Sequence, residues 1–274
     1  MGDLDRILGV LGEVRRRAIR LALVLGPLFG FLVTFRLQPI GVRLFGVVLP
    51  LAYPVPNLFY NVTAQVFRAL VALELPANVT LINYQVGDSV VAQMEIGAIL
   101  TVILGMPWIV HEVGAFLVPA LRRNERELLA WVGVPATVLF VTGTLVGLFF
   151  LTPLTFRLLF LYVAADGLAP ILGVQAFVTF VLLYSMAFGI VFELPVFVYT
   201  LTRLRLVRAS AWRKHWRGAI IGALVFGMVI TPDNSGITML LIATPMIALY
   251  FGGAWAAQRW ERSRDLSPPL AAGA

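Results

Sequence analysis

The chain has 274 residues, of which 60% are hydrophobic and only 13% are charged. Soluble domains usually carry about 25% charged residues, so this composition excludes an ordinary soluble domain and predicts a polytopic membrane protein. The absence of cysteine excludes disulfides and thiolate metal sites. We interpret the net charge of +7 as basic residues of membrane-flanking loops, not as a nucleic-acid site.

Six apolar runs follow one another along the chain. A helix needs roughly 20 apolar residues to cross a bilayer, and the fifth run, with 13 residues, is too short for a full crossing. The sequence therefore predicts an all-α protein with six transmembrane helices, of which the fifth and sixth are short. The runs are Ala18–Phe35, Ile96–Leu117, Leu128–Leu151, Gly173–Leu201, Gly218–Ile230 and Ile237–Ala257.

Basic residues gather on alternate connections between these runs. The N-terminal segment, the loops after the second and fourth runs, and the tail together hold 17 of the 21 lysines and arginines. Because basic loops favour the cytoplasmic side of a membrane, we expect both termini in the cytoplasm. We expect one membrane domain over 1–274, with a cytoplasmic helix start at 1–17 and a cytoplasmic tail at 258–274.

The segment between the first two runs, residues 37–95, is the predicted external cap. It is rich in proline, and Thr63–Leu73 has the amphipathic spacing of a helix. We expect a structured cap built from short helices at the outer interface.

Glu193 lies inside the fourth apolar run, about ten residues before Arg203 and so roughly 15 Å from its basic end. A carboxylate at membrane depth costs at least a few kcal/mol and indicates a functional residue, although a hydrogen bond in helix packing is the alternative. Gly189 and Pro195 flank it and predict a bend in this helix. Such bends favour a concave, cupped bundle over a compact one.

Several kinds of chemistry find no support in the sequence. A phosphate-binding loop needs a Gly-Lys-Ser/Thr sequence, and the only lysine is Lys214 in a Trp-Arg-Lys-His-Trp setting. His111 and Glu112 begin like a zinc protease motif but lack the second histidine four residues on. We therefore expect no catalytic dyad, no metal, no cofactor and no enzyme activity, with His111 a polar residue near the end of the second span.

Four segments together resemble the TatC family, the multispanning receptor component of the twin-arginine protein translocase. The first and second are similar to the Glu-Leu-Arg-x-Arg and Phe-x-x-Pro-Ala/Gly-Leu-x-x-x-Glu-Arg motifs of that family. The third is similar to Phe-Gly-x-x-Phe-Glu-x-Pro, and the fourth to the hairpin between the fifth and sixth spans. They are Leu11–Ala18, Phe116–Arg126, Met186–Val196 and Ile230–Leu241.

The resemblance implies a subunit that recognises twin-arginine signal peptides and exports folded proteins with proton motive force across a bacterial or archaeal cytoplasmic membrane. Glu13 and Glu125 would then be the carboxylates that grip the paired guanidinium groups, with Arg17 ordering Glu13. The alternative is that these glutamates only balance neighbouring arginines in solvent, where exposed pairs contribute about 0–1 kcal/mol.

The resemblance also places Phe116 and Pro119 beside that site. Phe116 would pack the apolar part of the signal peptide, unless it is an ordinary aromatic at a helix end. Glu193 would contact the inserted signal helix or offer a polar partner to TatA or TatB, and the other partners would be further copies of the chain and the bilayer. The competing interpretations are an ion- or proton-coupled small-solute transporter with Glu193 as the ion site, and an intramembrane enzyme.

Overall fold

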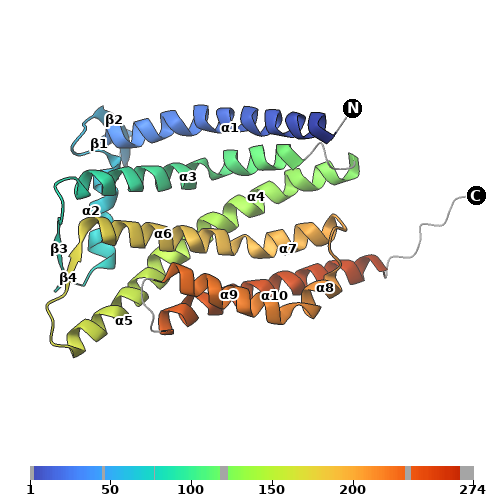
Figure 1. The fold of residues 1–274 in the computed structure, drawn as a ribbon. Coiled ribbons are helices and arrows are strands. Elements are labelled where there is room, and N and C mark those ends of the chain that lie inside the picture. The colour runs from blue at the N-terminus through green and yellow to red at the C-terminus, as the bar shows by residue number, and fades with distance from the viewer. Residues whose placement is uncertain (1–2, 45–46, 77, 118–122, 232–235, 266–274) are drawn as a thin grey trace, which may run out of the picture. The chain divides into compact units, whose positions relative to one another are not determined.

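The structure is a computed structural model that describes residues 3–44, 47–76, 78–117, 123–231 and 236–265 (Figure 1). The chain divides into two compact units, one made of Met1–Pro119 with Thr152–Leu182 and the other of Ala120–Leu151 with Leu183–Ala274. Helices dominate both units, which confirms the predicted all-α class. The predicted cupped outline of the bundle stays a prediction.

The elements follow a simple order along the chain. They are α1 (Asp3–Thr34), β1 (Phe35–Leu44), β2 (Val47–Pro56), α2 (Val62–Glu74), β3 (Thr80–Ile82), α3 (Asp88–Leu117), α4 (Arg123–Val146), the π-helix η2 (Gly147–Leu151), α5 (Thr152–Ala165), β4 (Ile171–Gly173), α6 (Val174–Phe192), α7 (Leu194–Arg203), α8 (Ala209–Lys214), α9 (Trp216–Ile230) and α10 (Ile237–Asp265).

Five helical stretches among the described residues are long and apolar enough to cross a membrane, and α9 is a shorter apolar helix. This confirms the six predicted apolar helices and the short fifth one. The sixth is longer than predicted, because Gln258 and the charged residues after it continue the α10 helix to Asp265. The long stretches are Leu11–Thr34, Asp88–Phe116, Trp131–Ala165, Val174–Arg203 and Ile237–Ser263.

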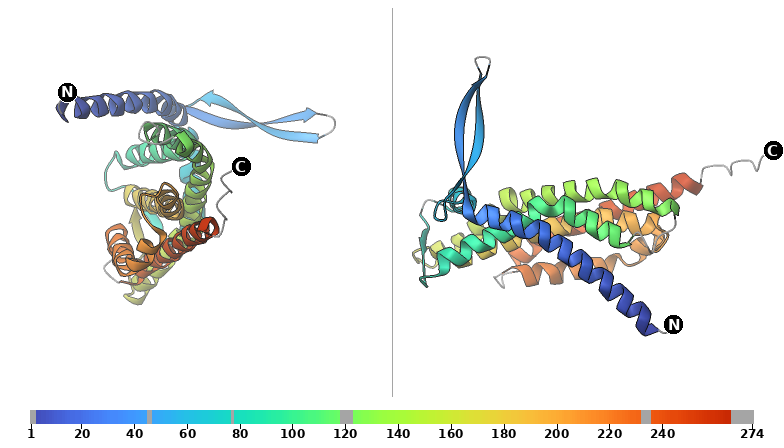
Figure 2. Two further views of the ribbon diagram at one scale, coloured as in Figure 1. Left: turned by 90° about the vertical axis from the view of Figure 1, so that its right-hand side faces the viewer. Right: turned by 90° about the horizontal axis from the view of Figure 1, so that it is seen from above.

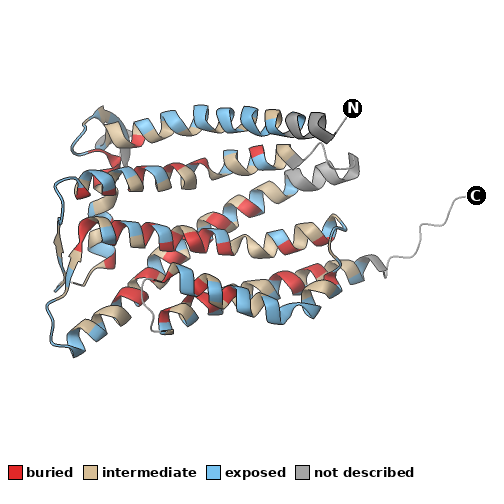
Figure 3. Ribbon diagram, in the orientation of Figure 1, coloured by how far each residue is buried: buried red, intermediate tan, exposed pale blue. Residues whose placement is uncertain are grey.

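In the first unit, α1 lies along α3 (Figure 1). Glycines of α3 permit the close approach: a Cβ added at Gly97 would lie 2.9 Å from Val33 Cγ2, and one added at Gly105 would collide with Leu25. In a lipid environment the hydrophobic effect does not drive helices together, so membrane helices usually pack closely through small residues. Most described side chains of α1 are nevertheless exposed (Figure 3).

The segment between α1 and α3, which we call the cap, begins with a feature that the sequence analysis did not predict. Strands β1 and β2 pair antiparallel from Phe35 with Pro56 to Leu44 with Val47. This hairpin extends away from the helices of its own unit (Figure 2). Its prolines suit a two-stranded ribbon, because every strand there is an edge strand on which a missing N–H is tolerated.

The predicted amphipathic helix of the cap is confirmed as α2. Asn61 begins it, accepting a hydrogen bond from Ala64 N at 2.8 Å. The same side chain donates to Val33 O of α1 at 2.6 Å and, being 1% exposed, fastens the cap to the spanning helices. The far end of α2 is Glu74, which is 3% exposed and whose two carboxyl oxygens have no hydrogen-bond partner among the described residues.

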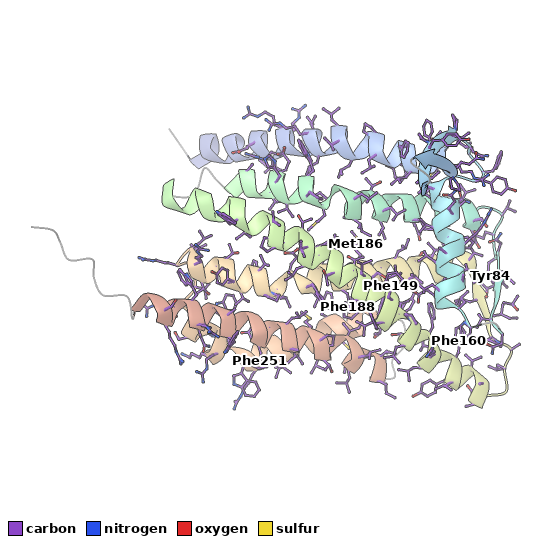
Figure 4. All side chains as sticks on the ribbon, turned by 180° about the vertical axis from the view of Figure 1, so that it is seen from behind. Tyr84, Phe149, Phe160, Met186, Phe188 and Phe251 are labelled. Atoms are coloured by element: carbon purple, nitrogen blue, oxygen red, sulfur yellow. The ribbon has the colours of Figure 1, made fainter. Side chains whose placement is uncertain are left out.

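The structure corrects the end of the cap, which the sequence analysis placed at Glu95. Helix α3 already begins at Asp88, whose carboxylate accepts hydrogen bonds from Tyr84 N at 2.8 Å and Gln85 N at 3.0 Å. Polar residues in its first two turns hide this start from an apolar scan. Strand β3 pairs parallel with β4 there, and Tyr84 (labelled in Figure 4) packs on Gly173.

In the second unit, α4 and the start of η2 approach α6 at two glycines four residues apart. A Cβ added at Gly143 would lie 2.7 Å from Phe188 O, and one added at Gly147 would lie 3.0 Å from Ser185 Cα. From the other side, Gly189 faces Thr144 and Phe140. This is the small-xxx-small pattern of membrane helix packing, and it positions the helix end that carries Glu193.

Helix α10 packs along α7 and α9. A Cβ added at Gly253 would lie 2.8 Å from Pro195 Cα, so the glycine sets the distance between α10 and α7. Tyr250 OH, in the middle of α10, donates to Trp212 O at 2.7 Å, and Trp212 Nε1 donates to Thr202 Oγ1 near the end of α7 at 2.9 Å. These bonds connect α7, α8 and α10.

Candidate functional site

Arg17 is the centre of a charged cluster between α1 and α3. Its Nη2 lies 2.6 Å from Glu13 Oε1, one helical turn away, and its Nη1 lies 3.2 Å from Glu112 Oε2 on α3. Arg20 adds a longer ion pair to Glu112, at 3.9 Å. The cluster thus joins the two helices through charge at the end opposite the cap.

The guanidinium of Arg17 is fully engaged. Its Nε donates to Glu13 Oε1 at 3.2 Å, and further donations reach the backbone oxygens of Ala115 at 2.8 Å and Glu112 at 3.4 Å. Together with the donations from Nη1 to the Glu112 carboxylate and from Nη2 to the Glu13 carboxylate, this makes five donations from the five N–H groups of an arginine. Arg17 is therefore a fixed part of the scaffold.

Glu13 remains partly open. Its side chain is 31% exposed, against 4% for Glu112. Oε1 takes both contacts from Arg17, while Oε2 has no partner among the described residues. A carboxylate that is held in place on one oxygen and open on the other can accept a hydrogen bond from an incoming cationic group.

Other predicted site residues are described only in part. Phe116 lies in the last turn of α3 and is half-buried. Glu125 lies in the first turn of α4, but its side chain is outside the described part of the chain, as is all of Pro119. The structure therefore brings Glu13 and Arg17 together and leaves the place of the Glu125 side chain a prediction.

Glu193 occupies the break between α6 and α7. Pro195 follows at the start of α7 and has no N–H for the carbonyl of Val191, so the helix is interrupted here, while the predicted bend stays a prediction. The Glu193 side chain makes no cap hydrogen bond, and its buried Oε1 has no partner among the described residues. A partnerless carboxyl oxygen inside an apolar span makes Glu193 a second candidate site.

Comparison with known proteins then identifies the family. The profile of "Sec-independent protein translocase protein (TatC)" matches residues 9–245. A protein of that name from Cenarchaeum symbiosum (strain A) is 37% identical over 252 residues, covering 92% of this chain and 94% of that protein. The chain belongs to the TatC family. It is therefore a multi-pass membrane component of the Sec-independent, twin-arginine protein translocase.

Other members support this assignment of the chain to TatC. A TatC protein from Synechocystis sp. is 29% identical over 66% of this chain and 71% of its own length. A solved structure of the twin-arginine translocase receptor TatC has a TM-score of 0.73 and 25% identity, covering 92% of this chain and 100% of the other. TatC proteins are translocase components that work with other Tat subunits, and they are not a known family of enzymes.

Sequence reasoning missed Glu112 as a partner of Arg17 in this TatC chain. The two residues are 95 positions apart, and nothing in the local pattern pairs them. The available signal was a carboxylate in the last turns of an apolar helix. Such a residue is costly in a membrane unless it is paired, and α1 carries the arginines at the same end.

Glu95 was missed for a different reason. It was assigned to the cap, yet it lies inside the span Asp88–Phe116. Its Oε2 accepts a hydrogen bond from Thr179 Oγ1 of α6 at 2.7 Å, within the first unit. A helix start at Asp88, an acidic residue of the kind that favours a first turn, was the signal that could have placed Glu95 in the span.

Proposed function

We propose that this chain is the signal-peptide-recognising core subunit of a twin-arginine translocase. It binds the paired arginines of a signal peptide at the cytoplasmic face and, powered by proton motive force, takes part in exporting folded proteins. Its location is a bacterial or archaeal cytoplasmic membrane, with both termini in the cytoplasm. The basic loops support this orientation, since basic residues are retained on the cytoplasmic side.

The observation that carries the proposal is the half-open carboxylate of Glu13. Two N–H groups of Arg17 donate hydrogen bonds to Oε1 of Glu13, and Oε2 remains available to a ligand. Guanidinium is planar and always charged, so an incoming arginine pairs with such a carboxylate by charge-assisted hydrogen bonds. Arg17 acts as a positioning residue, because its own donors are all in use.

Glu125 is proposed as the second carboxylate for the arginine pair, with Phe116 and Pro119 packing the apolar part of the signal. Phe116 is half-buried at the end of α3, so part of its surface is accessible to a ligand. Glu193 is proposed to contact the inserted signal helix or a polar group of TatA or TatB. Further copies of the chain complete the assembly.

The direct test is binding of a twin-arginine signal peptide to the purified full chain in detergent. Glu13→Gln keeps the shape of the side chain and removes its charge. A hydrogen bond to a charged group contributes roughly 1.5–3 kcal/mol, so we expect the affinity to fall by about tenfold to hundredfold. Glu125→Gln should produce a comparable loss in the same assay and impair export of a twin-arginine substrate in cells.

Two controls accompany this test. Glu261→Gln removes a carboxylate from α10 that has no described partner, and it should leave peptide affinity unchanged. A twin-lysine peptide should bind weakly to every variant, because lysine lacks the planar fork. Undiminished binding and export by both the Glu13 and the Glu125 variants would end the proposal.

A further inference from the structure

Two adjoining grooves lie beside α10 in the second unit. The first has a volume of about 440 Å³ and the second about 380 Å³. Trp255 and Gln258 line both, so the grooves form one continuous surface, which we call the α10 groove. Its remaining lining residues are Arg213, Trp216, Phe251 and Ala254 in the first groove, and Arg259, Arg262 and Ser263 in the second.

The α10 groove is strongly basic. Its described lining includes Arg213, Arg259 and Arg262 and no acidic residue. None of the three arginines forms an ion pair with a carboxylate among the described residues, unlike Arg17 in the first unit. Arg213 lines the first groove, and Arg259 and Arg262 line the second, next to it. Guanidinium groups without carboxylate partners along such a surface favour an anion with several oxygens, because arginine matches phosphate bidentately.

The same groove has an apolar wall. Trp255 is 61% exposed, Trp216 is 41% exposed, and Phe251 (labelled in Figure 4) is 44% exposed. The guanidinium of Arg259 lies over the Trp255 ring, 5.4 Å from its centroid. The positive charge and the aromatic surface of the groove are therefore in direct contact. Tryptophans with arginines at the end of a spanning helix are typical of the headgroup level of a bilayer.

The placement within the span decides between possible anions. Phe251, Ala254 and Trp255 lie within the candidate span Ile237–Ser263, whereas Arg262 lies at its end. A ligand that fills the groove therefore needs an anionic head beside the arginines and an apolar body along the helix. A free phosphate has no such body, whereas a phospholipid carries both parts in one molecule.

We propose that the α10 groove binds one anionic glycerophospholipid, with its phosphate among Arg213, Arg259 and Arg262 and its chains along Trp255 and Phe251. Basic pockets at the ends of spanning helices are a known way to hold anionic lipid headgroups. The lipid would fill the hollow between the end of α10 and the helices α8 and α9, and so support the short helix α9.

The test measures lipid binding to the purified full chain by native mass spectrometry, with phosphatidylglycerol and phosphatidylcholine as probes. We expect phosphatidylglycerol to bind at least tenfold more tightly. The triple variant Arg213→Gln, Arg259→Gln, Arg262→Gln should weaken that binding by at least about tenfold, because each basic residue near an anionic lipid contributes roughly fivefold. Inorganic phosphate at millimolar concentration should not displace the lipid.

A matched variant removes the same charge from the same end of the unit without touching the groove. Arg205, Arg208 and Lys214 are exposed and line neither groove, so their triple replacement by glutamine should change phosphatidylglycerol binding by less than about twofold. Equal losses in the two triple variants would indicate general attraction of charge and overturn the proposal. Equal binding of the two lipids, or full displacement by inorganic phosphate, would overturn it as well.

Discussion

Arg17 shows how a single side chain in this protein holds two helices and prepares a binding group. Its contacts with Glu13 and Glu112 and with the backbone of Ala115 use every donor that arginine has. The exposed arginines beside it in the sequence have a different role. Arg15 has no hydrogen bond or ion pair among the described residues and adds only charge to this end of α1.

This difference predicts the outcome of a conservative pair of substitutions. Arg17→Lys keeps the charge but replaces a planar fork of five donors by a compact group with three, so α1 and α3 lose part of their connection. We expect the thermal midpoint of the purified chain to fall by a few degrees and twin-arginine peptide binding to weaken. Arg15→Lys should alter neither property, and equal effects of the two substitutions would contradict a special role for Arg17.

At the scale of elements, glycines decide how closely the helices of the second unit pack. Gly252 and Gly253 are neighbours in α10, but a Cβ at Gly252 meets nothing within 4 Å, whereas one at Gly253 meets the backbone of Pro195 at 2.8 Å. Gly253→Ala must push α10 away from α7, and overpacking of this kind costs about 1–3 kcal/mol.

Gly252→Ala is the matched control, since alanine favours a helix over glycine by at most ~1 kcal/mol and has open space here. We therefore expect a lower thermal midpoint for Gly253→Ala and an equal or slightly higher one for Gly252→Ala, measured in the same detergent. A stable Gly253→Ala variant would mean that α7 and α10 are free to separate.

The cap carries a pH-dependent element in Glu74, the last residue of α2. Burial raises the pKa of its carboxyl from its ordinary 4.5 to about 8, and the negative end of the helix also disfavours a charge there. In the unfolded chain the group loses its proton near 4.5, whereas in the folded chain it keeps the proton until about 8. Folding stability should therefore fall as the pH rises through this window.

Glu74→Gln tests that expectation because glutamine stays neutral at every pH. We expect the thermal midpoint of the unchanged protein to decline between pH 4.5 and about 8, and the variant to lose most of this decline. At the acidic end of the window the two proteins should unfold at similar temperatures. If the variant had the same dependence of thermal midpoint on pH as the original protein, Glu74 would not be the cause of that dependence.

At the scale of the whole molecule, the proposed orientation is open to a direct test because the chain has no cysteine. Val86, in the cap, is fully exposed, and Ser210, in the basic loop region of α8, is exposed. In intact cells, a membrane-impermeant maleimide should label a Val86→Cys variant and spare a Ser210→Cys variant until the membrane is opened. The reverse pattern would invert the topology and place Glu13 outside.

The sequence predicted the spanning helices well and their polar partners poorly. The end of the fifth run at Ile230 and the start of the sixth at Ile237 agree with α9 and α10, because only helices satisfy the backbone of an apolar run in lipid. The start of α3 and the end of α10 were missed because polar residues such as Glu95 and Arg259 continue a helix beyond its apolar part. The β1–β2 ribbon was missed because the cap was expected to consist of short helices and because proline is rare in strands other than edge strands.

By itself, the sequence determined that this protein spans a membrane with six apolar helices and that its motifs belong to one translocase family. Composition and local spacing are sufficient for that, since each span must satisfy its own backbone hydrogen bonds. Only the tertiary structure decided that Arg17 is saturated by Glu13 and Glu112 and that Glu13 keeps one oxygen open. The contact of Arg17 with Glu112 joins residues 95 positions apart, and helix packing creates such contacts without leaving a local pattern.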